Sequence, residues 1–129
     1  MEVPLFTYGT LMRRRRLEVL CGCRLPDPVP AVLHGYAKFD TGLGYPVILP
    51  QPGGRVEGLL YRVPAEALPY LDHYEGADED PPHYTRTTVT VEVGGSQVEA
   101  QVYVGNPEVY RHLRPLGPGE PPQRPTPTA

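Results

Sequence analysis

Two short segments of the sequence carry groups that could do chemistry. The first is Leu5-Phe6-Thr7-Tyr8-Gly9-Thr10-Leu11, an apolar run that ends at a glycine beside hydroxyl side chains. If this run is a strand, the backbone N–H groups at its tip are free, and they form a concave site for a carboxylate or an oxyanion. The second segment is Leu71-Asp72-His73-Tyr74-Glu75-Gly76, which places the carboxylate of Glu75 at the end of an expected helix. Together the two segments predict an anion cradle and a proton-transfer residue in one small domain.

Both segments also have simpler interpretations. Tyr8-Gly9-Thr10-Leu11 could be a strand-to-helix turn in which Gly9 takes a positive φ angle and Thr10 caps the helix. Glu75 could be a solvated carboxylate, although the helix dipole disfavours that placement by about 0.3–1 kcal/mol. Seated beside apolar neighbours, Glu75 would instead have a raised pKa and suit a general base. Asp72 shares its helix face and is expected to be structural, as a hydrogen-bond partner of a loop.

Composition restricts the class of protein. The chain has 129 residues, which suits one domain, and its formal net charge of −3 does not favour nucleic acid or an anionic membrane as a partner. No apolar run approaches the ~20 residues of a membrane span. The N-terminus has no basic flank before its apolar run, so we expect no signal peptide and a cytoplasmic location.

No metal or cofactor site is evident in the sequence. The four histidines are not spaced as metal ligands, and Cys21 and Cys23 are expected to be ordinary thiols. No glycine-rich phosphate loop and no Gly-x-Ser-x-Gly motif is present. Arg13-Arg14-Arg15-Arg16 is the densest run of charge, and we expect a solvated helix face there, with steering of an anionic substrate as the alternative.

The hydrophobic pattern predicts the elements that would position these groups. Two short helices are expected, at 12–20 and 65–74, the second ending at Gly76 in a left-handed conformation. Strands are expected at 3–8, 31–39, 45–49 and 55–63, with a turn at Pro52-Gly53-Gly54 between the last two. Residues 84–104 predict a hairpin with Gly94-Gly95 as its turn.

Tight turns between most strands favour an α+β fold. We expect a small, mixed, mainly antiparallel β-barrel of about six strands with two short helices, because closure removes exposed edges. Residues 1–112 are expected to form this domain. Residues 113–129 are proline-rich and are expected to be an extended or disordered tail.

Several motifs taken in order resemble the gamma-glutamylcyclotransferase-like family, in its gamma-glutamylamine cyclotransferase type. These motifs span about residues 3–105 and are Tyr8-Gly9-Thr10-Leu11, Gly44-Tyr45-Pro46, Val56-Glu57-Gly58-Leu59-Leu60-Tyr61, Leu71-Asp72-His73-Tyr74-Glu75-Gly76 and Tyr84-x-Arg86. The resemblance implies a barrel with a cavity at one end and needs no cofactor. It also implies Glu75 as the catalytic residue, and a substrate site formed by Tyr8, Gly9, Thr10, Leu11, Tyr45, Tyr84 and Arg86.

The reaction implied by the resemblance releases 5-oxoproline from a small-molecule γ-glutamyl substrate. The α-amine attacks the side-chain carbonyl of the same γ-glutamyl group, and an amine leaves. Two alternatives stay open: a binding domain of the same fold that lacks catalysis, and an amidase in which Glu75 activates water. Apolar side chains between Tyr110 and Leu116 leave a homodimer open as well.

Overall fold

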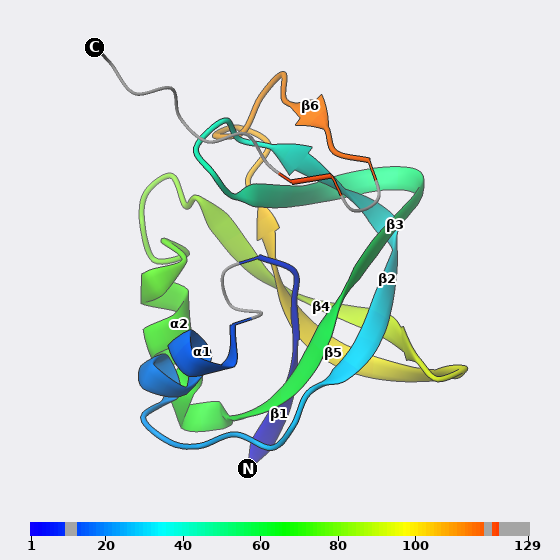
Figure 1. The fold of residues 1–129 in the computed structure, drawn as a ribbon. Coiled ribbons are helices and arrows are strands. Elements are labelled where there is room, and N and C mark those ends of the chain that lie inside the picture. Colours follow the sequence, from blue (N-terminus) through cyan, green and yellow to red (C-terminus); the bar gives the residue numbers. More distant parts are fainter. Residues whose placement is uncertain (10–12, 118–119, 122–129) are drawn as a thin grey trace.

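The computed structural model describes residues 1–9, 13–117 and 120–121. In this part of the chain, one sheet is accompanied by two helices (Figure 1). The helices are α1 (Arg14–Cys21) and α2 (Leu68–Tyr74), the latter preceded by a 3-10 turn at Ala65–Ala67. The strands are β1 (Glu2–Thr7), β2 (Val29–Asp40), β3 (Pro46–Pro64), β4 (Tyr84–Val93), β5 (Ser96–Gly105) and β6 (Arg114–Pro115). Within the described residues, no helix is long and apolar enough to cross a membrane.

The sheet closes on itself into a ring. The strand order is β3-β1-β5-β4-β2-β6, and an additional pairing between β2 and β3 joins the two sides. Only the contact between β1 and β5 is parallel, and the other pairings are antiparallel. The predicted α+β fold with a mainly antiparallel, closed sheet and two short helices is therefore confirmed.

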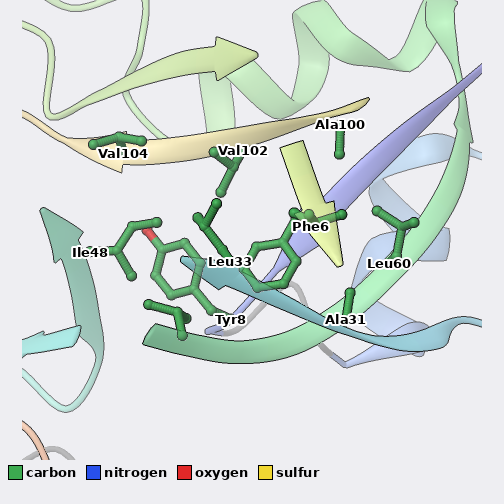
Figure 2. Packing of buried hydrophobic residues seen from close by; sticks show 11 residues of the cluster. Phe6, Tyr8, Ala31, Leu33, Ile48, Leu60, Ala100, Val102 and Val104 are labelled. Atoms are coloured by element: carbon green, nitrogen blue, oxygen red, sulfur yellow. The ribbon is translucent and has the colours of Figure 1, made fainter. Parts of the chain in front are cut away.

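Two hydrophobic clusters occupy the two faces of the sheet. Inside the ring, Phe6 and Tyr8 pack with Leu33, Ile48 and Val102 (Figure 2). The second cluster holds the helices against the outer face and includes Leu5, Leu17, Tyr61, Leu71 and Tyr103. Successive residues of a strand point to opposite faces, so β1 sends Leu5 to one cluster and Phe6 to the other.

The expected turn at Pro52-Gly53-Gly54 was wrong. β3 runs continuously from Pro46 to Pro64, and both of its halves pair with the single strand β2. His34 pairs with Arg55 and Tyr36 pairs with Pro50, so Gly35 alone faces residues 51–54. The proline and glycines therefore accommodate an irregularity within one long strand pair, where the sequence had indicated a break between two strands.

The segment after β5 folds back onto the sheet. β6 pairs with Phe39 and Asp40, and Leu116 donates its N–H to the carbonyl of Lys38 at 2.9 Å. Tyr110 and Leu113, which the sequence offered as exposed residues for a homodimer, are half-buried against the second cluster. The described part of this segment is thus attached to the domain.

Candidate functional site

A cavity of about 340 Å³ lies where the tip of β1 approaches the end of α2. It is bordered by segments that are distant in the sequence, including the loop before β3 and the chain after β5. Six tyrosines line it, namely Tyr8, Tyr45, Tyr74, Tyr84, Tyr103 and Tyr110. Among the described residues that line the cavity, none is lysine or arginine.

Glu75 is the carboxylate best placed for chemistry in this cavity. It is the C-cap of α2, where its N–H donates to the carbonyl of Leu71 at 3.0 Å. Gly76 follows with φ 70°, which ends the helix as the sequence predicted. Burial raises the pKa of Glu75 from 4.5 to about 7, because an ionised carboxylate loses its hydration there. Near neutral pH such a group can both accept and donate a proton.

Four of the tyrosines that line the cavity have raised pKa values. Burial raises the pKa of Tyr8, Tyr84 and Tyr103 well above the usual value, and the negative charge of Glu75 adds to each shift. Burial likewise raises the pKa of Tyr110 to about 12, with the hydroxyl of Tyr45 contributing. The ring of Tyr110 packs on that of Tyr84 with centroids 5.6 Å apart. These four tyrosines therefore give the cavity wall aromatic rings and uncharged hydroxyl groups.

Tyr8 and Gly9 bring the end of β1 to this wall. The buried hydroxyl of Tyr8 donates to the carbonyl of Tyr103 at 2.5 Å. Gly9 does not have a positive φ, and a Cβ built there would come no closer than 3.9 Å to Pro46. The simpler interpretation of Gly9, as a residue that the turn conformation requires, is therefore wrong.

Arg86 is not among the residues that line the cavity. Its Nε and Nη2 donate to the two carboxylate oxygens of Asp72, at 2.8 and 3.2 Å. Asp72 also accepts a hydrogen bond from the hydroxyl of Tyr103 at 2.7 Å. Asp72 accepts hydrogen bonds as expected, but its partners lie on the strands β4 and β5, not on a loop.

The structure thus gathers most of the predicted site. Tyr8, Gly9, Tyr45, Tyr84 and Glu75 all line the one cavity, while Thr10 and Leu11 lie outside the described residues.

Sequence reasoning missed several lining residues. Tyr103 could have been found, because the Gly94-Gly95 turn sets a register that pairs Tyr103 with Arg86. His73, Glu79 and His83 also line the cavity. His73 lies within the motif from Leu71 to Gly76 but was not predicted as a site residue, and no motif in the sequence marked Glu79, His83 or Tyr110.

The arginines at 13–16 are not among the residues that line the cavity, although Arg16 contacts one that is. Residues 13–16 are exposed, as expected for a solvated helix face. Arg14 pairs with Glu18 and Asp27 beside the helix, and Arg16 donates to the hydroxyl of Tyr74 at 2.8 Å. No group of three or more His, Cys, Asp or Glu side chains within the described ranges is arranged to hold a metal ion.

Comparison with known proteins gives consistent matches. The family model for gamma-glutamyl cyclotransferase, AIG2-like, matches residues 5–120. AIG2-like protein C of Arabidopsis thaliana is 37% identical over 100 residues, which cover 76% of this chain and 55% of that protein. Gamma-glutamylaminecyclotransferase A of Danio rerio is 29% identical over 116 residues, covering 78% and 68%.

The fold has matches among solved structures as well. A crystal structure of an AIG2-like protein from Mus musculus aligns with a TM-score of 0.72 at 25% identity, covering 98% of this chain and 97% of that one. The matched regions span only 55% and 65% of two curated relatives from Arabidopsis thaliana. The match to the family model over most of the chain, together with this fold, shows that the chain belongs to the gamma-glutamyl cyclotransferase, AIG2-like family.

Proposed function

We propose that this chain is a cyclotransferase that releases 5-oxoproline from γ-glutamyl amines or related γ-glutamyl conjugates. The observation that carries this proposal is Glu75, a carboxylate whose pKa burial raises to about 7, facing a cavity of small-molecule size. Family membership supports the same reaction class. Zebrafish gamma-glutamylaminecyclotransferase A, which the chain resembles, bears the name of that activity.

In the proposed mechanism Glu75 moves one proton between two nitrogen atoms. Its carboxylate removes a proton from the α-amine of the γ-glutamyl group, and the freed electron pair attacks the γ-carbonyl carbon. The new C–N bond closes the five-membered ring. When the bond to the leaving nitrogen breaks, protonated Glu75 returns the proton to that nitrogen, so the carboxylate is regenerated. Because the attack is intramolecular, a cavity that folds the substrate into this geometry supplies part of the rate.

The substrate's α-carboxylate needs hydrogen-bond donors. None of the described lining residues is lysine or arginine, so the candidate donors are tyrosine hydroxyls, the imidazoles of His73 and His83, and backbone N–H groups. We assign this role to the segment Tyr8-Gly9-Thr10-Leu11, of which the structure describes the first two residues. Tyr45 and Tyr84 form a further part of the substrate site in this proposal. Such donors would also stabilise the oxyanion that forms at the γ-carbonyl.

The test is a product assay with a panel of L-γ-glutamyl amines and dipeptides, scored by mass spectrometry. We expect 5-oxoproline from wild type and a loss of roughly 10²–10⁴-fold in kcat for Glu75→Gln, the usual contribution of general acid–base catalysis. Glu99→Gln is the matched control, because Glu99 is exposed on β5 and does not line the cavity.

Each other outcome removes a part of the proposal. Release of free glutamate would show an amidase that activates water. Binding of a γ-glutamyl ligand without any product would show a binding domain. Activity retained in Glu75→Gln would remove Glu75 from the mechanism.

A further inference from the structure

Asp72 accepts hydrogen bonds from three donors outside its own helix. The Nε and Nη2 atoms of Arg86 donate to its two oxygens, and the hydroxyl of Tyr103 donates to the same oxygen as Nε. Arg86 also donates to Gln101 at 3.3 Å, and Gln101 donates to Thr88 at 2.8 Å. The two residues that contact Asp72 come from β4 and β5, so Asp72 fastens α2 to the hairpin.

This arrangement acts on Glu75 because the two carboxylates are one helical turn apart. Asp72 precedes Glu75 by three residues, and its carbonyl accepts the N–H of Ala77 at 2.8 Å. The helix ends within this same turn. α2 has only seven residues and is too short to hold its shape alone. The contacts of Asp72 therefore set where the end of α2, and with it Glu75, lies relative to the sheet.

Tyr103 connects the two carboxylates more directly. Tyr103 lines the same cavity as Glu75. Burial raises the pKa of Tyr103 most, the hydrogen bond to Asp72 adds to that shift, and the charge of Glu75 contributes less. The Tyr103 hydroxyl has one proton, which it donates to Asp72. While this hydrogen bond to Asp72 is formed, the Tyr103 hydroxyl cannot donate to the Glu75 carboxylate.

We propose that Asp72 is a positioning residue for Glu75, which fixes the end of α2 on the β4–β5 hairpin and keeps the hydroxyl of Tyr103 engaged away from the Glu75 carboxylate. The role of Glu75 in this inference rests on the proposed function. Arg86 then belongs to the support of the catalytic residue, whereas the sequence had placed it in the substrate site.

Other titratable groups also face Glu75 and must be held constant in a test. Tyr8 approaches from β1, Tyr84 from β4, Tyr45 from the loop before β3, and Tyr110 from the segment after β5. At the same cavity lie His73 on α2 and the pair of Glu79 and His83. None of these is altered by a substitution at Asp72 or Tyr103.

The proposal predicts the direction of a titration. Removing Asp72 frees the Tyr103 hydroxyl to donate to the ionised form of Glu75, and a donor to the charged form lowers the pKa of an acid. In Asp72→Ala, the pKa of Glu75 should fall by about one unit or more. In Asp72→Ala with Tyr103→Phe, the pKa should return towards the wild-type value. Tyr103→Phe alone should leave it unchanged, because the hydroxyl is already engaged.

The experiment is an NMR titration of the glutamate side-chain carboxyls in ¹³C-labelled protein, with Glu75 assigned from the Glu75→Gln spectrum. Asp27→Ala is the matched control, because Asp27 is also paired with an arginine but lies outside the cavity. If Asp72→Ala does not fold, Asp72→Asn replaces it. The asparagine has one amide oxygen to accept the hydrogen bonds of Arg86 and Tyr103, whereas the two carboxylate oxygens of Asp72 accept them in wild type.

Activity gives a second readout. The acid limb of kcat/KM should move to lower pH in Asp72→Ala together with the pKa of Glu75. An unchanged pKa in this variant, or one that stays low in the double variant, would overturn the proposal. So would a shift in Tyr103→Phe alone. Absence of 5-oxoproline release by wild type would sink the proposed function but would leave the titration as a valid test of the link between Asp72 and Glu75.

Discussion

At the scale of single residues, the ionised carboxylate of Glu75 destabilises the folded state, because burial removes its hydration. Its pKa is about 7 in the folded chain, against 4.5 when unperturbed. The folded state therefore binds more protons than the unfolded state between these values, and stability falls as the pH rises through that window. At 1.36 kcal/mol per pKa unit, the cost above pH 7 is roughly 3 kcal/mol at most, and less where solvent reaches the side chain.

Glu75→Gln should therefore stabilise the fold while it removes activity. The gain over wild type should be small at pH 4.5, grow as the pH rises to about 7 and then level off, because Gln does not ionise. Urea unfolding at several pH values measures the difference directly. A gain that is independent of pH would show that burial does not raise the pKa of Glu75.

Gly9 gives a second prediction at this scale. Its backbone would accept a side chain, since its φ is not positive and, among the described residues, the atoms nearest to a Cβ built there are those of Pro46 at 3.9 Å. Gly9→Ala should leave stability unchanged or raise it by about 0.4–1 kcal/mol, through the unfolded state. If the backbone at Gly9 contacts the substrate, KM for a γ-glutamyl amine should rise at the same time. Thermal unfolding and steady-state kinetics separate the two effects, and an unchanged KM would argue against a contact.

At the scale of elements, Gly58 shows what a crowded glycine does. It lies in β3, where a Cβ would come within 2.2 Å of the carbonyl oxygen of Thr7 and 2.8 Å of the ring of Phe6. The oxygen belongs to the β1 backbone and cannot rotate away. Gly58→Ala should therefore cost about 1–3 kcal/mol or more, measured by urea unfolding, with Gly9→Ala as the uncrowded control. A cost below about 0.5 kcal/mol would show that β1 shifts freely, because overpacking is expected to cost more.

The local sequence pattern predicted the helices and strands better than it predicted the turns between them. Alternating valines and the Gly94-Gly95 turn predicted the hairpin of β4 and β5, because its pairing is fixed by neighbours in sequence. The Pro52-Gly53-Gly54 segment has the composition of a turn but lies within β3, because both flanking segments pair with β2. The continuity of β3 depends on its pairing with β2, which the local sequence around Pro52-Gly53-Gly54 does not contain.

The same distinction explains the site. Glu75 could be predicted because it shares a local motif with its helix end. Arg86 was placed in the substrate site from a motif, yet its partner Asp72 lies 14 residues away and is brought close only by the packing of α2 on the hairpin. Tyr110 has no local signal, since its place in the cavity depends on how the chain returns after β5.

At the scale of the whole molecule, the cavity depends on the chain's final segment. Tyr110 forms part of its wall, and Leu113 packs on the cluster beneath the helices. Arg114 then pairs with Asp40 at 3.1 Å, and the Asp40 side chain is only 4% exposed. Asp40 also accepts the N–H of Gly42, at the start of the loop that carries Tyr45. One buried carboxylate therefore holds two parts of the cavity wall.

This dependence predicts different results for two truncations. A chain that ends after residue 112 loses Leu113 and Arg114, and with them the ion pair between Arg114 and the buried carboxylate of Asp40. It should unfold at lower urea concentration and bind γ-glutamyl substrate more weakly, because Tyr45 and Tyr110 lose their support. A chain that ends after residue 121 keeps every described contact and should match the full chain. Urea unfolding and KM measured on both decide the matter. If the shorter chain matched the longer one, residues 113–121 would be a true appendage, and the domain would end near residue 112 as its composition first indicated.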